Sequence, residues 1–402
     1  MRNPLRSLFE TRAIGSPYEL AQLLSRGYQS TAGVEVTETT AMRIAAVATC
    51  VSLISRTVAS LPIDVIEQSG NVRNVAAGHW LTKLLAKPNP WQTRFEFLQT
   101  MQALLSLHRN AYAWLNWVSP GGRGQVVEMV PLHPTKVQVT QATEFANPTY
   151  VLNRRDGQQI PFAADEILHL RAVSTDGVSG RSTLDDGRDL FGGAIAQQNH
   201  SAGFWGTGGN PDVILKHPKT LSDKAKKGLE DSWQATYGGG PGKKRVAVIE
   251  EAMEVTPLSW SNEAAQFLET RQMSRAEIAG YFHVPPYMIG DVEKQTSWGT
   301  GVEQQQIGFV NFTIRPDLVL WEEKLCRQLL ENNPKYAIKF RVEGLLRGDS
   351  QARAAFYKTM REIGAYSAND VRAYEDLNPR EGGDAYGDLA YASGKQAPKE
   401  PA

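Results

Sequence analysis

The chain has 402 residues, enough for a large hydrophobic core and for more than one structural unit. Its 43 basic and 43 acidic side chains cancel to a formal net charge of zero. This balance argues against a protein that grips nucleic-acid phosphates over a broad surface, although it permits one that lets DNA slide past.

Cysteine usage and hydropathy exclude two further classes of protein. Cys50 and Cys326 lie far apart inside apolar patterns, so we expect buried packing residues and neither a disulfide framework nor a CxxC metal pair. The most apolar stretch, residues 44 to 55, is too short to cross a bilayer. We therefore expect a cytosolic or virion-associated protein without a membrane anchor.

The N-terminal third of the chain predicts a helical region that follows a polar arm. Residues 1 to 39 are rich in Ser, Thr and Gly, so we expect them to be flexible or ordered only against a neighbour, and we expect regular order to begin near Thr40. Apolar residues then recur at helical spacing and end at Pro62: Ile44, Val47, Val51, Ile54, Val58 and Leu61. Thr93 and Glu96 form a capping box that predicts a helix from Thr93 to about Leu107.

From residue 111 to residue 171 the hydrophobic period changes to two, which is typical of strands separated by turns. Trp114 and Trp117 lie in these strands and are expected to pack in the core rather than to bind a ligand. His169 is expected to be a simple strand residue. This part of the chain therefore predicts an α+β unit.

A helix ending near Trp205, a compact insert at 211 to 260 and a second helix from about Glu263 to His283 come next. Small residues on the first helix predict close approach by another helix: Gly192, Gly193, Ala194 and Ala196. The second helix must stop at Pro285 and Pro286, because two prolines remove backbone donors and push Val284 out of the α region.

A glycine-rich loop at 287 to 301 precedes a long helix expected from about Glu303 to Leu330. Pro316 lies in its middle and should kink it by deleting a backbone bond and clashing with the carbonyl of Phe312. The alternative is a pair of ordinary core helices with a surface loop. Two or three short helices are expected between 350 and 375, with a break at Gly364 and a cap at Asn369, and a disordered tail follows.

The search for catalytic chemistry finds no phosphate loop, no GxSxG elbow and no HExxH motif, and the seven histidines show no pair at metal-ligand spacing. No catalytic residue, metal site or cofactor is therefore predicted. The acidic residues Asp185, Asp186 and Asp189 could hold a metal, but the start of a helix favours capping and interaction with the helix dipole.

Several collinear motifs carry a family resemblance. They are CVSLISRTVASLPIDV at 50 to 65, KPNPWQTRFEF at 87 to 97, RNAYAWL at 109 to 115, EILHLR at 166 to 171, the run from IAGYFHVPP to NFTIRP at 278 to 316, LLRGDSQARAAFY at 345 to 357 and NDVRAYEDLNPREGGDAY at 369 to 386. Over roughly residues 40 to 386 the chain resembles the portal proteins, or head-tail connectors, of tailed bacteriophages of the HK97 type.

The resemblance implies an α+β portal fold with a mixed α/β wing, two stem helices that flank a small αβ clip, a long kinked helix and a helical C-terminal crown. Its implied ranges are a flexible arm at 1–39, the wing at 40–184, the first stem helix at 185–210, the clip at 211–260, the second stem helix at 261–286, a tunnel loop at 287–301, the long helix and return to the wing at 302–344, the crown at 345–386 and a disordered tail at 387–402.

The implied function is a ring of about twelve subunits at one capsid vertex, through which double-stranded DNA is packaged and ejected. Implied partners are the large terminase subunit, which supplies the energy, the major capsid protein and a head-tail adaptor protein. Two other classes stay open: a DNA-binding scaffold that wraps duplex directly, and an enzyme built on the α+β region.

The resemblance and the local chemistry together give candidate site residues. In the tunnel loop, Lys294 can touch a phosphate, whereas Gln295, Thr296 and Ser297 offer neutral hydrogen bonds, and Trp298 could instead anchor the loop to the body. Lys224, Lys226 and Lys227 are either solvated surface or a docking surface for terminase or adaptor. Pro285, Pro286 and Pro316 are the predicted hinge residues.

Overall fold

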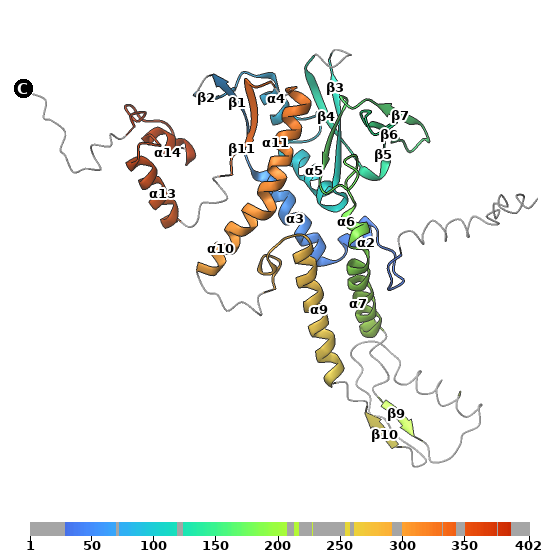
Figure 1. The fold of residues 1–402 in the computed structure, drawn as a ribbon. Coiled ribbons are helices and arrows are strands. Elements are labelled where there is room, and N and C mark those ends of the chain that lie inside the picture. Colours follow the sequence, from blue (N-terminus) through green and yellow to red (C-terminus); the bar gives the residue numbers. More distant parts are fainter. Residues whose placement is uncertain are drawn as a thin grey trace, which may run out of the picture.

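The computed structural model describes residues 29–69, 72–118, 124–206, 213–216, 227, 254–257, 261–291, 300–331, 333–342, 350–375 and 377–386. Figure 1 shows a body of helices and small sheets, from which two neighbouring helices descend to a short two-stranded ribbon. A long helix runs obliquely up into the body, and two C-terminal helices lie to one side.

The first helices of the body form where the apolar spacing predicts them. The helices are α2 (Glu38–Met42), α3 (Ala45–Ser60), α4 (Trp80–Ala86) and α5 (Arg94–His108). The predicted stripe on α3 is buried, including Val47, Val51 and Val58. Helix α5 begins with the predicted capping box, since the side chain of Thr93 accepts from Glu96 N and the Glu96 side chain accepts from Thr93 N. Helices α3 and α5 pack together in the main core.

One sheet joins the two ends of the body. Strand β1 (Ile63–Ser69) pairs antiparallel with β2 (Val72–Val75) on one side and with β11 (Tyr336–Phe340) on the other. The register places Ile63 opposite Phe340, so the segment after the long helix returns to the sheet beside α4. The family resemblance implied a return to the wing within 302–344, but the strand at Tyr336–Phe340 and its pairing with β1 were not predicted.

The region of period two forms two further antiparallel sheets. In the first, β3 (Asn110–Trp117) lies between β4 (Val126–Leu132) and β8 (Ile167–Arg171). In the second, β6 (Thr149–Asn153) lies between β5 (Val137–Thr140) and β7 (Gln159–Phe162), and the 3-10 turn η2 (Pro134–Lys136) connects β4 to β5. Trp114 and Trp117 are half-buried, and the indole of Trp117 donates to Asp165 O.

The N-terminal segment is folded earlier than the sequence predicts. Ser30 and Val36 are buried, and Gln29 forms a bridge with Glu35, so residues 29–39 are not a flexible arm in the structure. A Cβ at Gly192 would lie 2.1 Å from Ser30 Oγ, whereas one at Gly193 would meet nothing within 4 Å. Gly192 is therefore small because the N-terminal segment approaches it, and not because another helix does.

The C-terminal helices are α13 (Ser350–Glu362) and α14 (Ala368–Tyr374). Gly364 breaks the chain between them with a positive φ of 70°, as expected. The cap of α14 is Ser367, which forms a capping box with Asp370, and the expected cap Asn369 instead binds Arg380 O and Asp384. None of the helices in the described ranges combines the length and apolar character that a bilayer crossing needs.

Candidate functional site

Two helices and the ribbon at their far end form the most extended feature of the molecule. Helix α7 (Arg188–Gly206) follows the short helix α6 (Thr183–Asp186) and contacts α9 (Ser261–Tyr281). The ribbon consists of β9 (Val213–Lys216) and β10 (Glu254–Pro257), which pair antiparallel (Figure 1). Over residues 269–277 of α9 only Ser274 is buried, and Met273 is 65% exposed, so the described part of this helix is mostly uncovered in a single chain.

Aromatic packing fixes the upper ends of the paired helices. The ring of Phe191 is fully buried, with its centroid 5.7 Å from that of Tyr281 and 6.2 Å from that of Phe282. The Tyr281 hydroxyl donates to Thr183 O at 3.2 Å. Burial of this apolar cluster and the hydrogen bond tie α9 to α6 and α7 at the body, while the ribbon end projects away.

Helix α9 ends in a Schellman motif. His283 adopts φ 55°, its N–H donates to Gly280 O, and the N–H of Val284 donates to Ala279 O. A glycine usually occupies such a position, because the left-handed region strains other residues. Helix α9 therefore ends at Tyr281, two residues before the predicted end at His283, and the left-handed turn at His283 reverses the chain before Pro285 begins.

The segment after the motif is short and well connected. Pro286–Ile289 forms the 3-10 turn η3, which Gly290 ends with φ 81°. Arg275 of α9 donates from Nη2 to Ile289 O at 2.9 Å, and Thr313 of the long helix donates its hydroxyl to His283 O at 2.6 Å. This joint, residues 282–291, is thus bonded to both helices that it connects.

The long helix is continuous but changes its pitch. It consists of α10 (Thr300–Phe309), the π-helical turn η4 (Val310–Ile314) and α11 (Arg315–Leu329). The N–H of Arg315 donates to Val310 O, five residues back, and Pro316 follows in the first turn of α11. A π turn widens the helix, and it lies where the proline ring would otherwise clash with the carbonyl of Phe312. The irregularity predicted at Pro316 thus begins one turn earlier, as a π turn.

A buried polar network anchors the upper half of this helix. The side-chain amide of Gln102 on α5 donates to Asp317 Oδ2 at 2.6 Å and accepts from Trp321 Nε1 at 2.8 Å. Gln102 and Trp321 are fully buried. Burial raises the pKa of the Asp317 carboxyl to about 6, against the opposing effect of the Gln102 hydrogen bond.

An apolar hollow of about 370 Å³ lies between the joint and the long helix. Its walls include Val284, Pro285 and Phe309, and Phe312 on the π turn is 80% exposed beside it. Exposed aromatic side chains next to a hollow are typical of surfaces that contact another protein.

The predicted site residues are only partly within the described ranges. Pro285 and Pro286 lie in the joint, and Pro316 lies at the start of α11. The tunnel-loop residues Lys294, Gln295, Thr296, Ser297 and Trp298 fall outside the described residues, as do Lys224 and Lys226. Lys227 is helical and exposed. The roles of these residues stay predictions.

The three acidic residues at the start of α7 have separate partners. Asp186 pairs with Arg181 at 2.6 Å, Asp185 pairs with Arg188, and Asp189 accepts from Thr31 N at 2.9 Å. The capping interpretation is therefore too simple, because these carboxylates bind arginines and the N-terminal segment.

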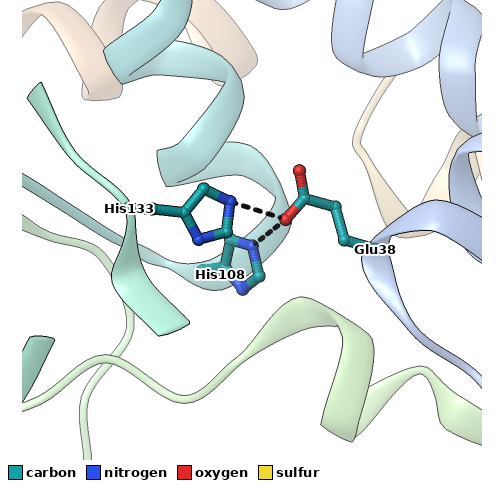
Figure 2. Close-up of side chains that lie close together, drawn as sticks. All are labelled: Glu38, His108 and His133. Atoms are coloured by element: carbon teal, nitrogen blue, oxygen red, sulfur yellow. Dashed lines mark hydrogen bonds and ion pairs between the residues drawn. The ribbon is translucent and has the colours of Figure 1, made fainter. Parts of the chain in front are cut away.

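The structure brings together three potential metal ligands that the sequence analysis missed. Glu38, His108 and His133 converge on one carboxylate oxygen, as Figure 2 shows. Their separation in the sequence gives no spacing signal, and only the packing of α2 against the ends of α5 and β4 makes them neighbours. His169, in contrast, is a buried strand residue as expected, bonded to Asn110 and Tyr150.

Comparisons with known proteins agree along most of the chain. A family model described as "Phage portal protein" matches residues 45–376. The portal protein of Enterobacteria phage HK97 is 33% identical over 349 residues, which cover 85% of this chain and 81% of that protein. The probable portal protein of Streptomyces phage phiC31 is 29% identical over 385 residues, covering 94% of this chain and 83% of that protein.

Solved structures of a gene transfer agent particle share the fold. The neck of the empty particle, computed with C6 symmetry, gives a TM-score of 0.60 at 21% identity and covers 84% of this chain and 93% of that chain. The neck of the native particle, computed with C12 symmetry, gives 0.58 at 19% identity and covers 89% of this chain and 99% of that chain. At these identities the likeness concerns the fold alone.

Proposed function

Because the chain belongs to the phage portal protein family, we propose that it forms a ring at one vertex of a capsid and that double-stranded DNA passes through the ring during packaging and ejection. The observation that carries this proposal is the family match over residues 45–376, which spans the paired helices, the joint and the long helix. The zero net charge suits a channel that does not hold DNA tightly.

By family resemblance the ring should contain about twelve copies, joined by a head-to-tail contact whose rotation divides a full turn so that the oligomer closes. The C6 and C12 symmetry of the necks that share this fold supports that number. Surfaces left open in one chain support the oligomer as well: the exposed face of α9 around Met273 and the exposed Phe312 beside its hollow. A neighbouring subunit would bury both.

The ribbon end of the paired helices is the proposed docking site for the large terminase subunit and later for the head-tail adaptor. The structure supports this by placing β9 and β10 at the tip that projects farthest from the body (Figure 1). The lysines at 224, 226 and 227 follow β9 in the sequence. The opposite part of the molecule would face the capsid interior, and the major capsid protein would surround the ring.

The loop after the joint is the proposed contact with DNA inside the channel. Its two ends are fixed by described residues, since Asp291 N–H donates to Pro286 O and α10 begins at Thr300. Lys294 would supply a single positive charge per subunit, and Gln295, Thr296 and Ser297 would supply hydrogen bonds without a sequence code. A ring of such loops would steady DNA without trapping it.

The proposed role requires no chemistry from this chain. We assign the energy of packaging to the separate terminase, in line with the lack of a phosphate-loop motif in the sequence. This chain would be located at one vertex of the virion, after assembly in the host cytoplasm.

A packaging experiment tests this function. Heads assembled with the chain should carry it at one vertex and should fill with DNA when terminase and ATP are added, whereas heads assembled without it should stay empty. Equal DNA content in both preparations would contradict the proposed function.

A further inference from the structure

Three side chains from separate elements meet at one carboxylate oxygen (Figure 2). The Nε2 atom of His108 lies 3.0 Å from Oε2 of Glu38, and Nε2 of His133 lies 2.9 Å from the same oxygen. The potential ligand atoms of all three side chains lie within 4.8 Å of one another. Ligands of one tetrahedral zinc ion, each at about 2.0–2.2 Å from the metal, would lie roughly 3.4 Å apart. The two distances from Glu38 to the histidine nitrogens would therefore open by about half an ångström, and the two histidine nitrogens, now within 4.8 Å of each other, would adopt the same separation.

Each of the three residues is held by its own local structure. His108 is the last residue of α5, which Arg109 ends in the left-handed region at φ 53°, and the side-chain amide of Asn110 donates to His108 O. His133 caps the turn η2. Glu38 is the first residue of α2, which begins with a capping box between Thr37 and Thr40. The backbone positions of the three side chains are therefore fixed before any ligand arrives.

Glu38 is the acidic group of the cluster, and its carboxylate can bind a cation when it is ionised. A carboxylate can only accept hydrogen bonds, so both histidine Nε2 atoms must carry protons in the metal-free arrangement. The hydrogen bond from His108 is the main cause that lowers the pKa of Glu38 below its usual value, and His133 adds to it, while partial burial opposes them. Glu38 is accordingly ionised at neutral pH.

A neighbouring hydroxyl can orient the more exposed histidine for a metal. Thr135 Oγ1 lies 2.8 Å from Nδ1 of His133. Metal binding through Nε2 requires the proton on Nδ1. That nitrogen would then donate to the threonine hydroxyl and give up the hydrogen bond that it accepts from Thr135 N in the metal-free arrangement. Such an outer hydrogen bond to the second ring nitrogen accompanies most histidine ligands of metals.

The cluster is also accessible. Glu38 and His133 form part of the walls of two hollows, of about 670 Å³ and about 610 Å³. An ion can therefore reach the three side chains from solvent, and a water molecule has space to complete its coordination.

We propose that Glu38, His108 and His133 form a binding site for one divalent transition-metal ion of the zinc type, with water as the fourth ligand. Two imidazole nitrogens and one carboxylate suit zinc and its neighbours, whereas magnesium and calcium prefer oxygen ligands alone. This inference is independent of the proposed portal function.

Metal binding would clamp the N-terminal segment to the body. Glu38 belongs to that segment, which also contacts the start of α7 through Thr31 and Asp189 and through Ser30 and Gly192. His108 and His133 belong to the body. A bound ion would therefore stabilise the packing of residues 29–42 at the point where α7 leaves the body.

The direct test is zinc binding by the full-length protein after removal of metals with a chelator. Calorimetric titration with zinc chloride should give one ion per subunit, and cobalt chloride should produce the visible absorption of a tetrahedral site. Glu38→Gln and His133→Gln should each weaken zinc binding by more than about 100-fold, because loss of an outer-shell partner alone costs about 10–100-fold. Thr135→Val should give that smaller loss.

Matched controls separate the site from adventitious surface binding. Glu35→Gln changes an exposed carboxylate of the same segment, and His200→Gln changes an exposed histidine on α7, so both should bind zinc as the unchanged protein does. Zinc should raise the thermal midpoint of the unchanged protein but not that of Glu38→Gln. The proposal is overturned if zinc does not bind at one equivalent, if Glu38→Gln and His133→Gln bind it equally well, or if magnesium displaces it at similar concentration; the cluster is then only a hydrogen-bonded contact.

Discussion

Gln102 connects two helices through a single side-chain amide, because it bonds both Asp317 and Trp321 of α11 from its place on α5. The two bonds use opposite ends of the amide, so no hydrophobic residue can replace Gln102 without leaving Asp317 and the Trp321 indole unpaired in the core. The long helix is thereby held in one register against the body.

Asp317 makes this network sensitive to pH. Its folded-state pKa of about 6 lies above the unfolded value of about 3.9, so the folded protein binds the proton more tightly. The stability that the protonated group contributes is therefore complete below about pH 4 and is lost as pH rises through 6. Asp317→Asn keeps an acceptor for Gln102 and removes the charge, and it should stabilise the protein by about 2 kcal/mol at pH 8.

Urea unfolding at pH 8 and at pH 4.5 measures the effect of Asp317→Asn. The gain should shrink to about a third at pH 4.5, because the native carboxyl is largely protonated there while most of the unfolded carboxyl is still ionised. Asp165→Asn, a change at an exposed aspartate, serves as the control and should have no effect at either pH. An equal gain at both pH values would show that charge burial is not the cause.

Lys294 is predicted to contact DNA inside the channel. Lys294→Ala removes one point charge per subunit, which becomes a ring of lost charges in the oligomer, so the variant should form rings normally but lower the amount of DNA packaged or retained per head. DNA per particle, measured after nuclease treatment, is the readout. Shortening residues 294–299 to a glycine linker should have the same effect; full heads from both variants would mean that the loop does not meet DNA in a way that matters.

Single residues with local rules were predictable, whereas residues that depend on tertiary packing were not. The Thr93–Glu96 capping box and, to within two residues, the end of α9 follow from neighbours in sequence. The cap of α14 was assigned to Asn369, because both Ser367 and Asn369 are good caps and only the fold selects Ser367. The cluster at Glu38 joins elements that no spacing rule relates.

At the scale of elements, the long helix shows how one proline shapes its surroundings. Pro316→Ala supplies a backbone N–H that can donate to Phe312 O and removes the ring that clashes with that carbonyl. We expect the π turn η4 to revert to α-helix and the helix to straighten there. The structure of the variant is the measurement, and an unchanged π turn would assign the bend to packing around Thr313 and His283.

The lysine-rich segment that follows β9 in the sequence is predicted to bind the large terminase subunit. Reversal of Lys224, Lys226 and Lys227 to glutamate should weaken binding of the large terminase subunit, because like charges would then face an acidic partner surface. Ring assembly should not change, since the substitution lies at the projecting end. Terminase binding and packaging rate are the readouts. Reversal of three exposed basic residues on the body, Lys83, Lys87 and Arg155, to glutamate is the charge-matched control; normal packaging by the triple lysine variant would count against docking there.

Helices and strands were predicted well where apolar residues recur at a clear period. They were predicted poorly where a strand pairs with a segment far away in the sequence. Helix α3, the region of period two and the helix after residue 261 follow their patterns closely. Strand β11 was not foreseen, because it pairs with β1 from the far end of the chain and its short run Tyr336–Phe340 has no turn-linked partner. Residues 29–39 look polar, yet they are ordered by contacts to α7.

At the scale of the whole molecule, the chain has surfaces that a single copy does not cover. Met273 on α9 and Phe312 on the long helix are both large, apolar and mostly exposed. The two lie on elements that the joint connects, so a ring could bury them along one continuous interface. The α+β architecture could be predicted from the sequence, whereas this exposed pair becomes visible only once the elements are placed.

Top-view class averages of the purified protein by electron microscopy test the ring most directly. The account predicts a closed ring with a central hole and about twelve repeats, as the family membership and the C12 symmetry of a neck that shares the fold suggest. A protein that stays monomeric across salt and protein concentrations, or that forms open filaments without a central hole, would contradict it.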